Sequence, residues 1–335
     1  MSVFVIAEAG ANHNNNFEQA KTLIDIASAS GADAVKFQTY SSETLYSKHT
    51  PDFAGLKNIN KLIKDIELPR EWQQDLKQYC DNVGIEFMST PFDELAVTQL
   101  VEIGVKRLKI AGFESTDPRF VKMVAATKLP IIVSAGIGNN ISSIQNILDW
   151  ITSVNSNPDI TVLHCNNAYP TPDQDINLNR IDTILQKYPK IKVGLSDHTE
   201  GILAPSLAVA KGATCIEKHF TISRMLPGPD HPFALEPEKL KEMIDNIRLA
   251  EKMCVDTNFL FTKSEDKFFK GMRSVVCNAD IKMGEVFTEQ NLTTKRPFLN
   301  GNFHASQYYS LIGKSAEKNY AYDDFVKMEE VADEI

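Results

Sequence analysis

Short apolar runs alternate with amphipathic stretches along the first 255 residues of the chain. The apolar runs are rich in β-branched residues, as strands buried on both faces are, and the stretches that follow them have apolar residues at helical spacing. The predicted strands cover residues 3–7, 34–38, 86–89, 107–110, 130–134, 160–165, 192–196 and 215–219. The predicted helices cover residues 17–30, 70–83, 93–103, 118–126, 141–154, 178–188, 202–211 and 236–254, with a short one at 60–66.

Eight strand–helix units in about 250 residues favour an α/β fold with a parallel sheet closed into a (β/α)8 TIM barrel. An open dinucleotide-binding sheet is disfavoured because the turn after the first strand, which begins at Gly10, lacks the glycine spacing of that fold.

The pattern changes after residue 255. Residues 1–255 are expected to form the barrel, residues 256–270 a linker, and residues 271–335 a small β-rich domain made of short strands and turns.

Composition narrows the possible partners. A net charge of −9 over 335 residues argues against nucleic acid or an anionic membrane as the main partner. The five cysteines are odd in number and widely spaced, which favours reduced thiols and a cytoplasmic protein. The N-terminal stretch lacks the basic start of a signal peptide, and no apolar run approaches the ~18 residues of a membrane span, so no membrane association is expected.

Almost every predicted strand ends in a polar or charged residue. In a barrel of this kind the catalytic groups lie at the C-terminal ends of the strands. Burying a charge there costs roughly several kcal/mol of folding free energy unless the charge is paired or binds a ligand. The polar residues at the strand ends are Glu8, Lys36, Gln38, Ser89, Thr90, Lys109, Ser134, His164, Asn167, Tyr169, Ser196, Asp197, His198, Glu217 and His219.

Two of these residues form a candidate metal site. His198 and His219 end neighbouring strands, so their imidazoles are expected to point into one cavity. Two imidazoles with oxygen ligands and open positions suit Mn²⁺, Fe²⁺, Zn²⁺ or Co²⁺. Asp197 and Glu217 either ligate the ion or only orient the imidazoles.

The lysines form a candidate anion site. Lys36 and Lys109, with Ser134 and Ser196 nearby, are suited to phosphate and carboxylate. The alternatives are that the lysines reach the rim or pair with carboxylates such as Glu8, or that one of them forms a Schiff base.

Two further segments lie outside the strand ends. The turn-rich loop at residues 227–231 would present Asp230 at the barrel mouth. Residues 295–297 form either a solvated basic pair or a lid that carries Arg296 over a barrel mouth. His231 has no clear structural context and is expected at the surface.

These motifs together resemble the sialic acid synthase family over nearly the whole chain. The matching segments are residues 7–14 (AEAGANHN), 35–39 (VKFQT), 89–92 (STPF), 163–165 (LHC), 169–172 (YPTP), 194–198 (GLSDH), 217–220 (EKHF) and 228–230 (GPD). The stretch from residues 273–275 (RSV) to 295–297 (KRP) resembles that family's C-terminal antifreeze-like domain.

The resemblance implies condensation of phosphoenolpyruvate with an N-acylated aminosugar aldehyde, giving a nonulosonic acid and phosphate. The sugar is left open between N-acetylmannosamine, its 6-phosphate and a 2,4-diacetamido-trideoxyhexose. By the same resemblance His198 and His219 hold a divalent metal, with Mn²⁺ preferred over Mg²⁺ and Co²⁺. The main alternative is a metal-dependent pyruvate aldolase or lyase on the same barrel.

The resemblance also assigns roles to individual residues. Glu8 would act with the two histidines in catalysis, by managing protons. Gly112 stands where the family usually has a serine, which leaves one phosphoenolpyruvate contact open. Arg296 would reach a neighbouring active site in a domain-swapped homodimer. Phosphoenolpyruvate would be held by Lys36, Lys109, Ser134, Asn167 and Ser196, and the sugar by Gln38, Tyr169, Asp230 and Arg296.

Overall fold

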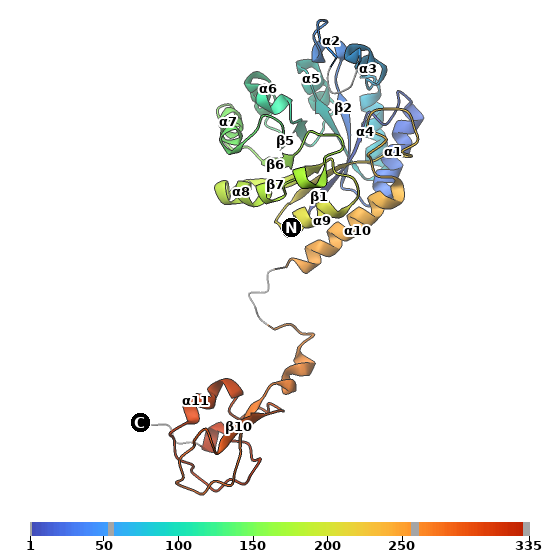
Figure 1. Ribbon diagram of the computed structural model, residues 1–335. Helices are drawn as coiled ribbons and strands as arrows, with labels where there is room; N and C mark the ends of the chain where they lie inside the picture. Colours follow the sequence, from blue (N-terminus) through green and yellow to red (C-terminus); the bar gives the residue numbers. More distant parts are fainter. Residues whose placement is uncertain (1, 53–56, 256–260, 331–335) are drawn as a thin grey trace. The chain divides into compact units, whose positions relative to one another are not determined.

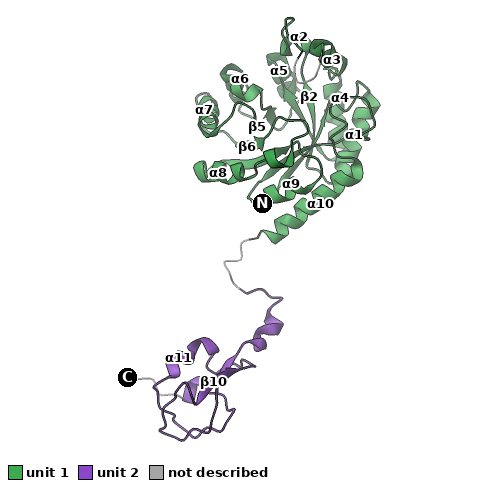
Figure 2. Cartoon of the chain, in the orientation of Figure 1, with its two compact units in different colours: residues 1–255 green, residues 256–335 purple. Residues whose placement is uncertain are grey.

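The computed structural model (Figure 1) describes residues 2–52, 57–255 and 261–330. The chain divides into two compact units, Met1–Val255 and Asp256–Ile335 (Figure 2). Residues 256–260 of the predicted linker and 331–335 of the predicted small domain lie outside the described residues.

The first unit is built around one parallel sheet of eight strands. Its ladder runs β3-β2-β1-β8-β7-β6-β5-β4, and β3 and β4 lie next to each other where the sheet comes round on itself. The predicted (β/α)8 barrel is therefore confirmed. The strands are β1 (Phe4–Gly10), β2 (Ala34–Thr39), β3 (Glu86–Pro91), β4 (Leu108–Ile110), β5 (Ile131–Ala135), β6 (Ile160–Cys165), β7 (Lys192–Asp197) and β8 (Cys215–His219).

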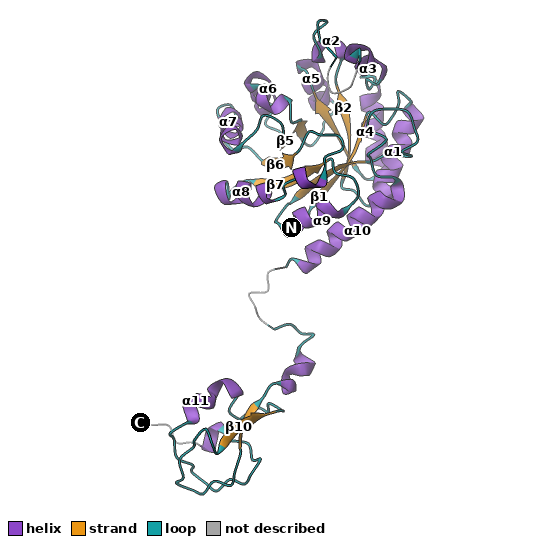
Figure 3. Cartoon of the chain, in the orientation of Figure 1, coloured by secondary structure: helices purple, strands orange, loops and turns teal. Residues whose placement is uncertain are grey.

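Each strand is followed by a helix, and the helices surround the strands (Figure 3). The connection between β2 and α4 also contains α2 (Ser42–Leu45), which the hydrophobic pattern did not predict, and α3 (Ile59–Asp65). The eight outer helices are α1 (Phe17–Ala29), α4 (Trp72–Val83), α5 (Glu94–Glu102), α6 (Pro118–Ala126), α7 (Ile141–Thr152), α8 (Asn179–Lys187), α9 (Leu203–Ala210) and α10 (Pro237–Met253).

Local side-chain chemistry fixes where several helices begin. The side chain of Asn16 accepts a hydrogen bond from the backbone of Gln19 at the start of α1. Asp93 caps α5 in the same way, and Asn140 forms a reciprocal capping box with Ser143 at the start of α7. Such caps satisfy backbone N–H groups that the first turn leaves without partners.

Two apolar layers hold the barrel. The larger one packs outward-facing strand residues against the helices. The smaller one fills the barrel interior, and at this level Gly194 has no space for a side chain: a Cβ there would lie 2.2 Å from the carbonyl oxygen of Cys215. The interior layer consists of Ile6, Ala34, Met88, Ile132, Leu163 and Cys215.

The first strand is longer than the hydrophobic pattern predicts. It continues through Glu8 to Gly10 rather than ending at residue 7. Glu8 is thereby in register with Lys36 of β2 on one side and with His219 of β8 on the other. The ladder hydrogen bonds thus fix the carboxylate directly above the apolar interior.

The second unit has its own small core and few regular strands. Strands β9 (Ser274–Cys277) and β10 (Leu292–Lys295) form an antiparallel pair, and isolated bridges such as that between Ile281 and Tyr320 add to it. Its helical elements are η3 (Asp266–Gly271), η4 (Ala305–Gln307), α11 (Tyr308–Leu311) and η5 (Met328–Glu330). Its identity as an antifreeze-like domain stays a prediction.

No helix in the described part of the chain combines the length and the apolar character needed to cross a membrane. The cytoplasmic location stays a prediction.

Candidate active site

The polar ends of the barrel strands converge on one cavity of about 210 Å³. Because side chains alternate across a strand, the residue two positions beyond each member of the apolar interior layer also faces inward. Arg296 lies in the second unit, so its predicted role at the sugar stays a prediction. The other predicted site residues all line the cavity: Glu8, Lys36, Gln38, Lys109, Ser134, Asn167, Tyr169, Ser196, His198, His219 and Asp230.

A buried network of charges forms the floor of this cavity. The ammonium group of Lys36 lies 2.8 Å from a carboxylate oxygen of Glu8 and 3.7 Å from one of Glu217. Lys109 lies 3.9 Å from that same Glu217 oxygen. All four side chains are buried, so they interact in a medium that screens charge far less than water does. Two cations are thereby held side by side by one shared carboxylate.

Neutral hydrogen-bonding groups complete the floor. Lys109 donates a 2.8 Å hydrogen bond to the hydroxyl of Ser134, and Ser196 donates one of 3.1 Å to Glu217. Lys36 donates one of 2.9 Å to Thr90. The floor therefore offers ammonium and hydroxyl donors together, which suits an anionic ligand with several oxygens.

The pKa values of the floor groups follow from burial and from their charged neighbours. Burial raises the pKa of Glu8 to about 7, although Lys36 acts in the opposite direction. Burial also acts to raise the pKa of Glu217, but Lys109 and Lys36 outweigh it and hold that pKa below its usual value. Burial lowers the pKa of Lys109. Glu8 is thus the carboxyl group of this network whose proton is exchanged near neutral pH.

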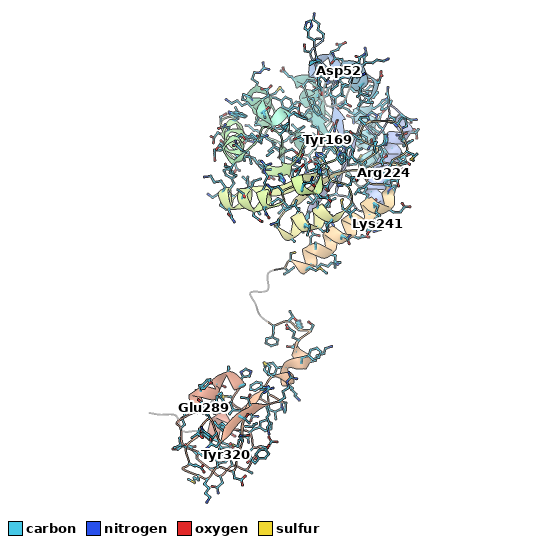
Figure 4. All side chains as sticks on the ribbon, viewed as in Figure 1. Asp52, Tyr169, Arg224, Lys241, Glu289 and Tyr320 are labelled. Atoms are coloured by element: carbon cyan, nitrogen blue, oxygen red, sulfur yellow. The ribbon has the colours of Figure 1, made fainter. Side chains whose placement is uncertain are left out.

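The two imidazoles lie together at the rim of the floor, with ring centroids 5.4 Å apart. The Nδ1 atom of His198 lies 2.6 Å from the carbonyl oxygen of Asn166. The buried Nδ1 of His219 has no hydrogen-bond partner among the described residues and lies 3.7 Å from a carboxylate oxygen of Asp230. Tyr169, labelled in Figure 4, packs against His198 at a centroid distance of 4.2 Å.

These imidazoles fit a divalent metal. Burial lowers the pKa of His198 to about 4 and holds that of His219 well below its usual value, so both are neutral, as metal ligands must be. Within the described residues, no three His, Cys, Asp or Glu side chains are grouped closely enough to hold an ion by themselves. A metal held by the two histidines would therefore keep positions open for other oxygen ligands.

The two acidic residues that precede the histidines differ in their positions. Glu217 faces the cavity with His219. Asp197 is buried outside the cavity, where its carboxylate lies 2.6 Å from the ammonium of Lys218 and accepts hydrogen bonds from Thr199. Asp197 is therefore not a metal ligand; it ties the end of β7 to the end of β8 beside both histidines.

The loop that carries Asp230 is anchored by a buried histidine. The expectation that His231 lies at the surface is wrong: its ring is fully buried, with Nδ1 2.6 Å from the Thr221 hydroxyl and Nε2 3.1 Å from Asn14. Gly10 makes room for this loop. It adopts a positive φ of +51°, and a Cβ on it would lie 2.8 Å from Asp230. Burial raises the pKa of Asp230 to about 6.

Asn167 occupies space left by two glycines. A Cβ at Gly136 would lie 1.9 Å from its Oδ1 atom, and one at Gly112 would lie 2.9 Å away. The same Oδ1 accepts a 2.8 Å hydrogen bond from the backbone of Ile137. The amide group of Asn167 thus reaches the cavity because residues 112 and 136 carry no side chains.

Sequence reasoning missed one wall of the cavity. Tyr40, Phe92 and Phe113 follow β2, β3 and β4, and Ile63 comes from α3. These residues lie beyond the strands, where no periodicity marks a buried face. Glu217 and Thr90 appeared among the strand ends without a firm role, and strand alternation is the pattern that places both inward.

The comparisons with known proteins point to one family. A model of the NeuB family matches residues 23–258. The N,N'-diacetyllegionaminic acid synthase of Campylobacter jejuni is 39% identical over 332 residues, covering 96% of this chain and 98% of the relative. A pseudaminic acid synthase of Campylobacter jejuni is 36% identical, with 97% and 95% covered. The crystal structure of an N-acetylneuraminic acid synthetase from Leptospira borgpetersenii in complex with citrate has a TM-score of 0.73 at 34% identity, over 80% of this chain and 90% of that one.

Proposed function

The chain belongs to the NeuB family, and we propose that it is a nonulosonic acid synthase, which condenses phosphoenolpyruvate with an N-acyl aminosugar aldehyde and releases phosphate. The observation that carries this proposal is the position of two buried lysines beside a pair of neutral imidazoles at one barrel mouth. The lysines suit a multiply charged phosphate and carboxylate ligand, and the imidazoles suit a metal that polarises an aldehyde.

Phosphoenolpyruvate would bind on the cavity floor. Lys36 and Lys109 would neutralise its charges, while Ser134, Ser196 and Asn167 would donate hydrogen bonds to its oxygens. Glu217 lies 3.7 Å from the ammonium group of Lys36 and 3.9 Å from that of Lys109, so it holds the two groups together before the ligand arrives.

His198 and His219 would hold the divalent metal, which we propose to be Mn²⁺. When bound, the metal supplies Lewis-acid activation of the sugar aldehyde. The chain's own contribution is to present both imidazoles in the neutral form. The carbonyl of Asn166 orients the ring of His198, and the packing of Tyr169 against that ring restricts it further.

Glu8 would manage the protons of the reaction. A new bond forms between C3 of phosphoenolpyruvate and the aldehyde carbon, and the aldehyde oxygen takes up a proton. Water adds at C2 and gives up a proton. The bond between C2 and the phosphate oxygen then breaks, and the C2 hydroxyl becomes a ketone as its proton passes to the departing phosphate. A carboxyl group with a pKa of about 7, accepting a 2.8 Å hydrogen bond from Gln38, can donate or accept either proton near neutral pH.

The sugar would extend from the imidazoles toward the barrel rim. Gln38, Tyr169 and Asp230 line that part of the cavity and offer hydrogen-bonding groups to its hydroxyls and amide. Arg296 would serve the active site of the neighbouring subunit in a domain-swapped homodimer.

The test is release of inorganic phosphate from phosphoenolpyruvate in the presence of Mn²⁺ and a panel of N-acyl hexosamines. We expect release that depends on both the sugar and the metal, and that His219→Ala abolishes while its circular dichroism spectrum stays that of the parent. The competing function, a pyruvate aldolase, would instead consume free pyruvate and release no phosphate.

A further inference from the structure

A second cavity, of about 400 Å³, adjoins the active-site cavity on the side of β5 and β6. It is lined by residues 136–139, by residues 165–168 and by Arg180. The first segment leads from β5 toward α7, the second runs on from the end of β6, and Arg180 belongs to α8; α7 and α8 lie on the same side of the barrel in Figure 1. Ile137 in this lining is 59% exposed, so the second cavity opens to solvent.

The two cavities share a thin partition. Cys165 and Asn167 line both of them. The side chain of Asn167 lies against Gly136 and accepts a 2.8 Å hydrogen bond from the backbone of Ile137. Since Asn167 would also contact phosphoenolpyruvate, a ligand on the floor is separated from the second cavity by one side chain.

Arg180 gives the second cavity an unpaired positive charge. No described residue that lines this cavity is acidic, and Arg180 forms no ion pair with any carboxylate in the described part of the chain. Its guanidinium donates a 2.9 Å hydrogen bond to the backbone carbonyl of Asn139, which positions the group and leaves further N–H donors for a ligand. The planar arrangement of these donors suits two oxygens of one phosphate.

Asn139 adds a hydrogen-bond acceptor at the same place. Its side chain is buried, and the amide nitrogen donates a 2.9 Å hydrogen bond to the hydroxyl of Ser115. The Oδ1 atom has no partner among the described residues. A buried acceptor without a donor costs free energy, so a ligand that brings a hydrogen is favoured. Hydrogen phosphate has oxygens for Arg180 and a P–OH group for Asn139, whereas sulfate at neutral pH has oxygens alone.

We propose that the second cavity is a binding site for inorganic phosphate, held by the guanidinium of Arg180 and the side chain of Asn139. Its position beside Asn167 suits it to receive the phosphate that the reaction releases, and this link rests on the function proposed above. The sugar product would occupy the mouth of the first cavity, above the floor on which phosphate forms. The second cavity would let phosphate leave the floor without passing that product.

Isothermal titration of the full chain with inorganic phosphate at neutral pH tests the site without turnover. We expect two binding events in the parent, one at the lysines of the floor and one at Arg180. Arg180→Gln removes the charge and should weaken the second event by at least about tenfold while the first remains. Lys187→Gln is the matched control, because Lys187 is exposed on the same helix and lies outside the lining; it should keep both events.

Titration with sulfate tests the part played by Asn139. Sulfate should bind at Arg180 at least about tenfold more weakly than phosphate does, because it brings no hydrogen to the Oδ1 atom. Equal affinity for the two anions would contradict the role of Asn139. Phosphate binding that is the same in the parent and in Arg180→Gln would overturn the site itself.

Product inhibition tests the link to the reaction. Phosphate on the floor competes with phosphoenolpyruvate, whereas phosphate at Arg180 does not, so inhibition of the parent by phosphate should be mixed. It should become purely competitive in Arg180→Gln and stay mixed in Lys187→Gln. If Arg180 binds phosphate but its replacement leaves the inhibition mixed, the link to the reaction is overturned. If no sugar supports phosphate release, the proposed function fails, and the titrations still decide whether the second cavity binds phosphate.

Discussion

The buried ion pair between Asp197 and Lys218 should stabilise the barrel and align its two candidate metal ligands. Each member directly precedes one of the histidines, and the side chains are 0% and 1% exposed. The perturbation is Lys218→Met, which keeps much of the side-chain volume and removes the ammonium group. Among the described residues, it leaves the carboxylate of Asp197 with the two hydrogen bonds donated by Thr199.

The expected loss is large because the remaining charge is isolated from water. Removing one partner of a buried ion pair typically costs about 3–5 kcal/mol of unfolding free energy. The double variant Asp197→Asn with Lys218→Met removes both charges and should recover about 2 kcal/mol or more of that loss. The double variant recovers stability because Asp197→Asn removes the carboxylate charge that Lys218→Met leaves unpaired.

Urea unfolding followed by tryptophan fluorescence measures this effect. Both tryptophans, Trp72 and Trp150, lie in the barrel unit, so the signal reports that unit. Isothermal titration with Mn²⁺ gives a second readout, in which Lys218→Met should weaken binding. The reasoning is refuted if Lys218→Met costs less than about 1 kcal/mol, or if the double variant is no more stable than the single one.

Three other predictions concern separate features. Gly112→Ala should raise the KM for phosphoenolpyruvate more than that for the sugar, because its Cβ would lie 2.9 Å from Oδ1 of Asn167 and it adds no hydroxyl group; an unchanged KM would show that Asn167 does not contact that substrate. Burial lowers the pKa of His13 to about 4, so between pH 6.5 and 4 the unfolded chain binds a proton that the folded chain does not, and stability falls as the pH falls. His13→Asn should therefore lose less stability than the parent between pH 7 and 4.5, by about 2 kcal/mol in urea unfolding, and equal losses would contradict this. Arg296→Ala should raise the KM for the sugar more than that for phosphoenolpyruvate, and the reverse order would contradict its proposed role.

The barrel was predictable because its pattern is repeated and local. Each strand is an apolar run between a glycine or polar turn and an amphipathic helix, and the polar residues at the strand ends mark the active face. Alternation along β8 also places Glu217 and His219 on one face and Lys218 on the other. The same rule, applied to β7, separates Asp197 from Ser196 without any structure.

The remaining features depend on contacts between distant segments. The ring of His231 contacts Thr221, about 10 residues earlier in the chain, and Asn14, more than 200 residues earlier. The residues next to His231 in the sequence therefore give no sign that it is buried. The cavity wall that sequence reasoning missed is assembled from residues after three different strands and from α3. No single segment of the sequence has a hydrophobic pattern that predicts this wall.

The most direct test of the central claim is to follow the bond between C2 and the phosphate oxygen. The full chain would be supplied with Mn²⁺, an N-acyl aminosugar that supports turnover and phosphoenolpyruvate labelled with ¹⁸O in that bridge, with His219→Ala as the inactive control. Mass spectrometry should find the label in inorganic phosphate. It should also find an unlabelled keto product that has gained the three carbons of pyruvate. Label retained in the keto product, or product formed without phosphate release, would contradict the account.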